Sequence, residues 1–301
     1  MNITVSGLGR MGGQIARRLI DDGHTVTAHD INPKLIKALE DYGAAGAPAK
    51  KDVIRHGGER LVLWLMIPSN SVANELAEWT EILPAGSIVV DGGNSDFRDT
   101  IRHAHLAASK GIQLIDVGTS GGIHGLKNGF SMMVGGDQAA YEYIEPVLAS
   151  LSKPHGGYRY FGPAGAGHYV KMVHNAIEYG VMESLAEGYR LLREGPYEKL
   201  DLIDAGEVWQ EGSIIASNLN ALTVTALKNN PSLDDVSGYV AESGEARWAL
   251  EVAKERSIEV PAIQAAFDVR IASQTGRTNF ATKLLAMMRN AFGGHTINKD
   301  A

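Results

Sequence analysis

The fold is decided by residues 3–20, ITVSGLGRMGGQIARRLI, in which a short β-rich run leads into three spaced glycines and then into a helix-like stretch. Gly7 permits a tight turn, Gly9 lets the backbone approach a pyrophosphate, and Gly12 allows the helix to pack closely on the strand. The first amides of the helix would face the phosphates, because they have no partners within the helix. The pattern therefore predicts a dinucleotide-binding loop whose contacts are Gly7, Leu8, Gly9, Arg10, Met11 and Gly12.

Beyond this loop, short β-rich runs alternate with helix-length segments as far as about residue 161. The expected strands are 3–5, 25–27, 61–65, 87–90, 112–115 and 131–134. Such alternation is typical of βαβ units and predicts an α/β, Rossmann-like, doubly wound and mainly parallel sheet. After GPAGAG at 162–167 the pattern is helical to the end. We expect a cofactor-binding domain over 1–163 and an all-α domain over 164–301, divided near Pro163.

The second expected strand ends at His29 and Asp30, where an acid that binds a ribose is expected. A carboxylate that accepts hydrogen bonds from both ribose hydroxyls would repel a 2'-phosphate, so Asp30 favours NAD over NADP. Lys34 could still assist a 2'-phosphate, which keeps NADP as the weaker alternative, and Asp30 can also be read as an ordinary turn acid. Met66 and Asn94 follow the third and fourth strands and are candidate contacts, although Asn94 is equally typical of a turn.

The composition narrows the classes of function. The 301 residues include no cysteine, which excludes disulfides, thiolate metal sites and a cysteine nucleophile. A net charge of -7 gives no overall attraction for nucleic acid or an anionic membrane, so an anionic ligand must meet a local basic cluster. The longest strongly apolar run, 61–67, falls far short of the roughly 20 residues of a membrane helix, and the chain opens as a strand rather than a signal peptide. We expect a cytoplasmic protein with neither kind of partner.

One helix carries the candidate chemistry. In the stretch 169–179, YVKMVHNAIEY, the residues Lys171, His174, Asn175 and Glu178 stand at i, i+3, i+4 and i+7, which places them on one face. Because the rest of the circumference is mostly apolar, we expect a buried helix with this stripe facing an enclosed cleft, the alternative being a solvated stripe. Lys171 can act as a general base if its pKa falls by about two units, and Glu178 can hold a proton if an apolar wall raises its pKa.

Ser120, Gly121 and Gly122 follow the expected strand at 112–115. They offer a hydroxyl and two amides that no side chain obstructs, which suits a carboxylate, although flexible glycine turns also occur without a ligand. The sequence thus predicts a second anion-binding point, separate from the glycine loop.

These segments, taken in order, resemble those of decarboxylating 6-phosphogluconate dehydrogenases. The resemblance includes the glycine loop, DGGN at 91–94, SGG at 120–122 and KMVHNAIEY at 171–179, and it runs from residue 1 to about 295. The stretch 171–179 is the most specific part, and the length is similar to that of the short-chain branch. The glycine loop alone is shared with the wider β-hydroxyacid dehydrogenase superfamily.

The resemblance implies a reaction and a role for each matching residue. 6-Phospho-D-gluconate, a sugar phosphate acid, would be oxidised with NAD and decarboxylated to D-ribulose 5-phosphate without a metal, in the pentose phosphate pathway or gluconate metabolism. Lys171 would remove the C3 hydroxyl proton, and Glu178 would protonate C1 of the enediol. The implied substrate contacts are Asn94, Ser120, Gly121, Gly122, His174 and Asn175, with Tyr179, Arg247, Arg270 and Arg289 on the phosphate and His295 reaching in from the tail.

One loop departs from the family pattern, and two other functions stay open. Over 244–249 the chain reads GEARWA, with Arg247 where many members carry lysine and Ala249 in place of a threonine, so a charge is kept and a hydroxyl is lost. The first alternative is a 3-hydroxyisobutyrate-like, NAD-dependent dehydrogenase of a small β-hydroxy acid. The second is a non-catalytic NAD-binding regulator that uses its helical domain for partners.

The resemblance also implies a homodimer or a homotetramer. In that arrangement, Arg289 and His295 would enter the site of the neighbouring subunit. The simpler interpretation of the same segment is a helix that ends at a glycine and is followed by a frayed terminus.

Overall fold

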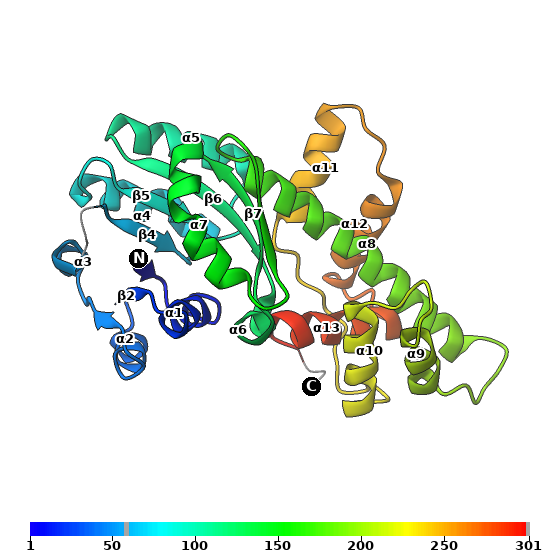
Figure 1. The fold of residues 1–301 in the computed structure, drawn as a ribbon. Helices are drawn as coiled ribbons and strands as arrows, with labels where there is room; N and C mark the ends of the chain where they lie inside the picture. Colours follow the sequence, from blue (N-terminus) through cyan, green and yellow to red (C-terminus); the bar gives the residue numbers. More distant parts are fainter. Residues whose placement is uncertain (57–59, 299–301) are drawn as a thin grey trace. The chain divides into compact units, whose positions relative to one another are not determined.

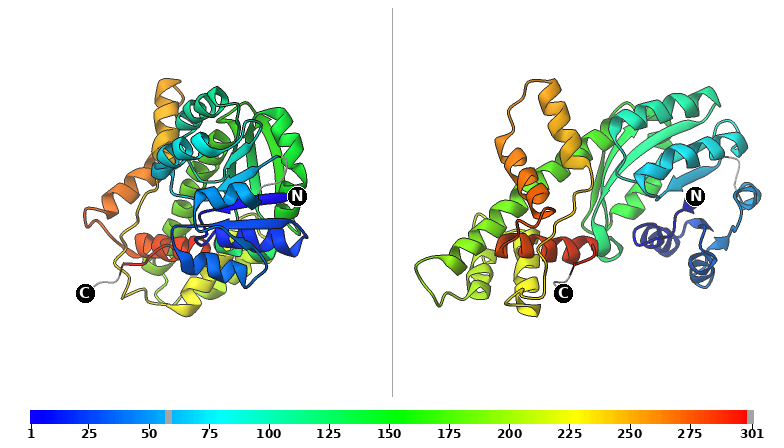
Figure 2. Two further views of the ribbon diagram at one scale, coloured as in Figure 1. Left: turned by 90° about the vertical axis from the view of Figure 1, so that its left-hand side faces the viewer. Right: turned by 180° about the vertical axis from the view of Figure 1, so that it is seen from behind.

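The computed structural model describes residues 1–56 and 60–298, and the chain divides into two compact units, Met1–Met172 and Val173–Ala301. Figures 1 and 2 follow the chain from blue at its N-terminus to red at its C-terminus. The division falls inside the long helix α8 (Ala166–Glu194). Each unit has a hydrophobic core of its own.

Within the described residues, the first unit holds an eight-stranded sheet of order β3-β2-β1-β4-β5-β6-β7-β8. Its strands are β1 (Asn2–Ser6), β2 (Thr25–His29), β3 (Ala45–Gly46), β4 (Val62–Leu65), β5 (Ile88–Asp91), β6 (Gln113–Ser120), β7 (Ser131–Gly136) and β8 (Gly157–Gly162). Its helices before α8 are α1 (Gly12–Asp21), α2 (Pro33–Glu40), α3 (Lys50–His56), α4 (Ser69–Ile82), α5 (Phe97–Ser109), the 3-10 turn η1 (Gly122–His124), α6 (Gly125–Asn128) and α7 (Gln138–Ser152).

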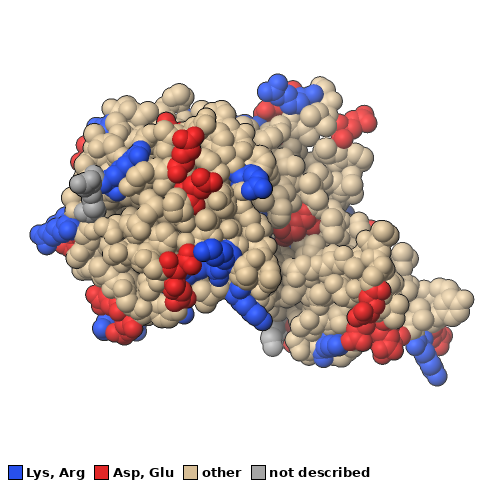
Figure 3. Space-filling model, in the orientation of Figure 1, with Lys and Arg blue, Asp and Glu red and all other residues tan. Residues whose placement is uncertain are grey.

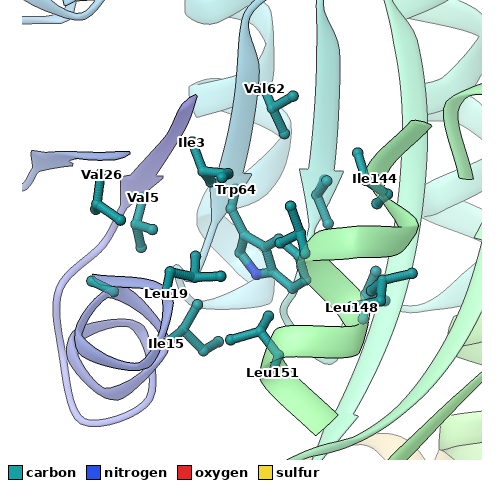
Figure 4. Close-up of a cluster of buried hydrophobic side chains, with 14 of the residues drawn as sticks. Ile3, Val5, Ile15, Leu19, Val26, Val62, Trp64, Ile144, Leu148 and Leu151 are labelled. Atoms are coloured by element: carbon teal, nitrogen blue, oxygen red, sulfur yellow. The ribbon is translucent and has the colours of Figure 1, made fainter. Parts of the chain in front are cut away.

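Helices cover both faces of this sheet, because side chains of a strand point alternately to its two sides. On one face, α1, α2 and α7 pack over β1, β4 and β5, and Figure 4 shows Trp64 of β4 beside Ile15 of α1 and Leu151 of α7. On the other face, α3, α4 and α5 pack on Leu63 and on Val89 of β5. The apolar strands β4 and β5 are therefore buried from both sides, as expected for the centre of a parallel sheet.

The strand directions place the functional loops. β1, β2, β4, β5 and β6 run parallel, so their carboxyl ends meet at one edge of the sheet. β7 pairs antiparallel with β6, and β8 pairs parallel with β7. The sequence pattern did not predict β3 or β8. β3 has only two residues, and β8 alternates exposed and half-buried positions, which gives little hydrophobic signal.

The second unit is built from helices. After α8 these are α9 (Leu202–Gln210), α10 (Asn218–Asn229), α11 (Glu245–Glu255), α12 (Pro261–Ser273) and α13 (Phe280–Gly293). Its core joins apolar residues of α8, α10 and α13, among them Met182, Tyr189 and Leu285. Asn279 caps the start of α13, and Gly294 ends that helix in the left-handed conformation. The expected helix end at a glycine is thus confirmed.

The predicted fold class, a Rossmann-like α/β sheet followed by an all-α region, is confirmed. The compact units divide nine residues after the expected boundary at Pro163, because the first turns of α8 pack on the sheet. None of the described helices is long and apolar enough to span a membrane. On the face drawn in Figure 3, acidic and basic side chains are interspersed and not gathered by sign.

Candidate active site

The glycine loop has the geometry of a phosphate cradle. Gly7 has a φ of +89°, and a Cβ there would lie 2.5 Å from the Met66 carbonyl oxygen. A Cβ on Gly12, the first residue of α1, would lie 1.9 Å from the Gly7 carbonyl oxygen. Around Gly9, in contrast, a Cβ would meet nothing within 4 Å. The loop is thus packed against β4 on one side and open at Gly9, which fits the approach of a dinucleotide phosphate.

Asp30 closes this loop over the end of β2. Its Oδ2 accepts a hydrogen bond from the Leu8 N–H at 2.6 Å, and its Oδ1 accepts one from the Asn32 N–H at 2.7 Å. Each carboxylate oxygen keeps a second lone pair, so the side chain can still accept from ribose hydroxyls. Asp30 therefore combines the expected cofactor contact with a structural role that the sequence pattern did not indicate.

The loops after β4 and β5 hold the other candidate cofactor contacts. The sulfur of Met66 accepts a hydrogen bond from Trp64 Nε1 at 3.2 Å, which fixes Met66 beneath the glycine loop. At the end of β5, the buried Asp91 accepts hydrogen bonds from the Gly93 N–H at 3.1 Å and from the Ser95 hydroxyl at 2.8 Å. Asn94 lies between these two anchors and is exposed. The loop is rigidly held while Asn94 stays available to a ligand.

Lys171 lies against the strand that ends at Ser120. The side chain is only 5% exposed, and a Cβ on Gly118 would lie 2.3 Å from the Lys171 Cβ. Gly118 is therefore required for α8 to approach β6, and the sequence motifs did not predict this role. Its position two residues before Ser120 was the available signal. Gly121 has a φ of +137°, so the chain turns sharply after Ser120 and leaves Ser120, Gly121 and Gly122 partly or fully exposed.

The polar stripe of α8 continues in the second unit. His174 Nδ1 lies 3.0 Å from Asn175 Oδ1 and 4.0 Å from Glu178 Oε2, and Asn175 Nδ2 donates to Glu245 Oε1 at 3.1 Å. Glu245, at the start of α11, is buried and was not predicted to belong here. No sequence spacing relates Glu245 to the polar stripe, because Glu245 reaches the stripe only through the packing of α11 on α8.

The expectation that the other faces of α8 are buried is wrong in the single chain. Ile177 and Val181 are 55% and 42% exposed, whereas Ala176, Tyr179 and Met182 are buried. The apolar residues therefore divide into a core-facing group and an uncovered group. Residue type alone could not separate these two groups, because both are apolar.

Tyr179 and two arginines form a buried basic cluster in the second unit. Arg270 of α12 is 2% exposed, with its guanidinium carbon 3.2 Å from the centre of the Tyr179 ring. Burial, together with the positive charge of Arg289 on α13, lowers the Arg270 pKa to about 10. Arg289 is 8% exposed, and burial lowers its pKa too. Among the described residues, neither guanidinium has a carboxylate at ion-pair distance, which leaves both available to an anion.

The other two predicted phosphate contacts, Arg247 and His295, have partners different from those of Arg270 and Arg289. Arg247 of α11 is bound to Glu242 and lines a cavity of about 620 Å³ between α11 and α12, together with Lys254, Pro261 and Phe267. His295 follows α13, where its ring lies 6.2 Å from that of Phe292 and its carbonyl oxygen accepts from Asn290. Arg289, expected to enter a neighbouring subunit, is within electrostatic reach of Tyr179 and Glu245 of its own chain, and its entry into a second subunit stays a prediction.

Glu183 is a further buried acid that the sequence did not reveal. It lies one helical turn after Tyr179 on α8, is 7% exposed, and its Oε2 has no hydrogen-bond partner in the described part of the chain. Burial first, and then the like charge of Glu187, raise its pKa to about 7 against the opposing charge of Arg270. Its charge therefore depends on pH near neutrality.

Comparison with known proteins assigns this arrangement to a family. The sequence model for the NAD binding domain of 6-phosphogluconate dehydrogenase matches residues 2–164, and that for the C-terminal domain of the same enzyme matches residues 167–290. The chain belongs to the 6-phosphogluconate dehydrogenase family. It is 37% identical to the NAD(+)-dependent, decarboxylating 6-phosphogluconate dehydrogenase of Haloferax volcanii, over 99% of this chain and 98% of that protein.

Solved structures extend the comparison to the fold. The 6-phosphogluconate dehydrogenase of Plasmodium falciparum matches 91% of this chain with a TM-score of 0.82 and 26% identity, and the match spans 62% of that longer chain. The 3-hydroxyisobutyrate dehydrogenase of Mycobacterium tuberculosis matches 94% of this chain and 97% of its own with a TM-score of 0.72, at 20% identity. 6-Phosphogluconate dehydrogenases and 3-hydroxyisobutyrate dehydrogenases thus share this fold, and the site residues must separate the two functions.

Proposed function

We propose that this 6-phosphogluconate dehydrogenase homologue converts 6-phospho-D-gluconate to D-ribulose 5-phosphate and carbon dioxide with NAD, in gluconate or pentose phosphate metabolism. The observation that carries the proposal is the pair of buried arginines, Arg270 and Arg289, beside Tyr179. A phosphate dianion supplies the charge that two buried guanidinium groups require, whereas a small unphosphorylated β-hydroxy acid does not.

The first unit would hold the cofactor. The open backbone at Gly9 and the N-terminus of α1 suit the pyrophosphate, Asp30 suits the ribose, and Met66 and Asn94 border the same crevice. NAD, when bound, supplies the acceptor for the hydride that leaves C3 of the substrate. Asp30 supports NAD over NADP, because its carboxylate would repel a 2'-phosphate.

Lys171 and Glu178 would move the protons. The neutral amine of Lys171 takes the proton of the C3 hydroxyl as that carbon is oxidised to a ketone. The C1–C2 bond then breaks, carbon dioxide leaves, and the bonding electrons form the C2–C3 double bond of an enediol while Lys171 returns its proton to the C3 oxygen. The positive charge on Lys171 stabilises negative charge at this oxygen, so the step needs no metal. Glu178 finally donates a proton to the former C2, which is C1 of ribulose 5-phosphate, while Lys171 takes the proton of the adjacent enediol hydroxyl, whose oxygen becomes the ketone oxygen at C2 of the product.

The remaining residues would place the substrate between these groups. Ser120, Gly121 and Gly122 offer a hydroxyl and two amides to the carboxylate, and His174 and Asn175 offer polar atoms to the sugar hydroxyls. Tyr179, Arg270 and Arg289 would bind the phosphate, supported by Arg247 and His295 from the segments around them. Lys171 and Tyr179 are eight residues apart on α8, which corresponds to about 12 Å along a helix and suits a six-carbon substrate.

We also propose a homodimer or homotetramer in which the segment bearing His295 reaches the neighbouring site. The uncovered apolar residues Ile177 and Val181 of α8 support association of the helical region. Arg289 serves its own subunit in this proposal, since it already lies near Tyr179 of the same chain.

The test is the formation of NADH, followed by its absorbance, with 6-phosphogluconate and with 3-hydroxyisobutyrate, each supplied with NAD or NADP. We expect turnover with 6-phosphogluconate and NAD, together with stoichiometric release of carbon dioxide. Faster turnover of 3-hydroxyisobutyrate would favour the small-acid dehydrogenase. Binding of NAD without turnover of either acid would favour a regulator.

A further inference from the structure

A buried polar cluster in the first unit links three elements, β6, α8 and α5, through hydrogen bonds of side chains. Asp116 of β6 is fully buried, and its two oxygens accept hydrogen bonds at 2.8 Å from the Gly165 and His168 N–H groups at the start of α8. His168 Nδ1 lies 2.7 Å from the hydroxyl oxygen of Thr100, which belongs to α5. β6, α8 and α5 are thereby linked through side chains.

The cluster is costly, which argues that it has a purpose beyond holding the fold. Burial raises the Asp116 pKa, and His168 opposes that shift. Two buried ring nitrogens, His168 Nε2 and His103 Nδ1, have no hydrogen-bond partner among the described residues. A partly satisfied polar cluster in a core is less stable than apolar packing of the same shape. Thr100 and His168 are therefore poor choices if stability is the only requirement.

Thr100 and His168, the two partners of this hydrogen bond, each lie close in sequence to a proposed site residue. Thr100 lies in the second turn of α5, which begins directly after the anchored loop that presents Asn94. His168 lies one helical turn before Lys171, which packs on Gly118 of the same strand that carries Asp116. The Thr100–His168 hydrogen bond consequently connects the loop after β5 with the helix that carries the proposed base.

We propose that Thr100 and His168 are positioning residues, which set Lys171 relative to the Asn94 loop. This inference rests on the proposed function, in which Lys171 must reach the substrate hydroxyl while the Asn94 loop borders the cofactor. A general base acts only within hydrogen-bond reach, and a displacement of about 1 Å can cost about 100-fold in rate. The titratable groups within electrostatic reach of His168 are Asp116 from β6 and His103 from α5, and Asp91 from β5 is within reach of both of these.

The test compares Thr100→Val, which removes the hydroxyl and keeps the shape, with Thr100→Ser, which keeps the hydroxyl. We expect Thr100→Val to lower kcat at least tenfold, to leave KM for NAD within about twofold, and to shift the acidic limb of the kcat/KM profile, where Lys171 loses its proton. Thr100→Ser should restore most of kcat. Thr80→Val is the matched control, because Thr80 is a buried threonine of α4 whose hydroxyl binds Ala77 of its own helix.

A purely structural role predicts a different result. Thr100→Val and Thr80→Val would then both lower the melting temperature and leave kcat and its pH profile unchanged in the folded enzyme. That outcome overturns the proposal, as does a Thr100→Ser variant as slow as Thr100→Val.

A second readout needs no substrate. Trace acetylation of Lys171 with acetic anhydride, followed by mass spectrometry across pH, measures the reactivity and apparent pKa of this amine. We expect the Lys171 titration of Thr100→Val to differ from wild type by about 0.5 unit or more, and that of Thr80→Val to superimpose on it. If the wild-type enzyme does not turn over 6-phosphogluconate, the proposed function alone is refuted. If the Lys171 titrations of Thr100→Val and wild type superimpose, the positioning role is refuted.

Discussion

Replacing Glu183 with glutamine should stabilise the protein above neutral pH. The Glu183 pKa is raised from 4.5 to about 7, chiefly by burial and next by the charge of Glu187. A group whose pKa is raised in the folded state contributes stability below its unfolded pKa and loses that contribution as pH rises through the folded pKa. The loss therefore develops between pH 4.5 and 7, and above pH 7 the buried carboxylate destabilises the fold.

The size of the effect follows from the shift. A full shift of this kind corresponds to about 3 kcal/mol, and relaxation of the surroundings together with the favourable Arg270 charge reduces the expected effect to about 1 to 2 kcal/mol. For a chain of 301 residues that is a rise of roughly 2 to 3 °C in melting temperature. Glu183→Gln should gain this at pH 8 and progressively less as pH falls toward 4.5.

Thermal unfolding at several pH values, with helical circular dichroism as the signal, measures this difference. Glu211→Gln is the control, because Glu211 is exposed and should give a difference that does not depend on pH. Glu187→Gln should give part of the gain, since it removes the like charge that raises the Glu183 pKa. The reasoning is refuted if Glu183→Gln is less stable than wild type at pH 8, or if its gain is the same at every pH.

Three further predictions concern the proposed reaction. Asp30→Ser should raise the ratio of kcat/KM for NADP to kcat/KM for NAD. It should also weaken the binding of both cofactors, because Asp30 accepts a hydrogen bond from the Leu8 N–H of the glycine loop. A wild-type enzyme with a higher kcat/KM for NADP than for NAD would contradict this prediction. Lys171→Ala should abolish NADH formation, and a near-wild-type kcat in this variant would exclude Lys171 as the base. Glu178→Gln should impair proton delivery to C1, and incorporation of solvent deuterium into the product would measure this loss. Refolding Lys171→Ala subunits with His295→Ala subunits should restore activity if the tail crosses between subunits. Refolding them with Arg289→Ala subunits should not, if Arg289 serves its own site as we propose.

The order of strands and helices could be predicted because it depends on local pattern. The glycine loop and the apolar runs that became β1, β4 and β5 are short, contiguous signals. β3 was missed because a two-residue strand pairs through backbone contacts alone. The direction of β7 was also undetermined, since antiparallel and parallel pairing of one short strand leave the same apolar pattern.

The site was predictable where it lies on one element and unpredictable where it depends on packing between elements. The spacing of Lys171 and Glu178 along α8 needed only helical geometry. Glu245 and Glu183 were missed because their burial results from α11 and α12 packing against α8, which no sequence spacing records. The roles of Asp30 and Gly118 likewise became visible only as a backbone hydrogen bond and as a close approach.

The contact between Trp64 and Met66 gives the protein an optical probe of its own. The indole is fully buried in β4, and its nitrogen is held by the sulfur of the residue that supports the glycine loop. Indole emission overlaps the absorption band of reduced nicotinamide, so a reduced dinucleotide seated on this loop would quench Trp64 and emit in turn. Because the hydrogen bond to Met66 holds the indole ring in place, quenching of Trp64 would measure the fraction of sites that hold the reduced dinucleotide, and no attached dye would be needed.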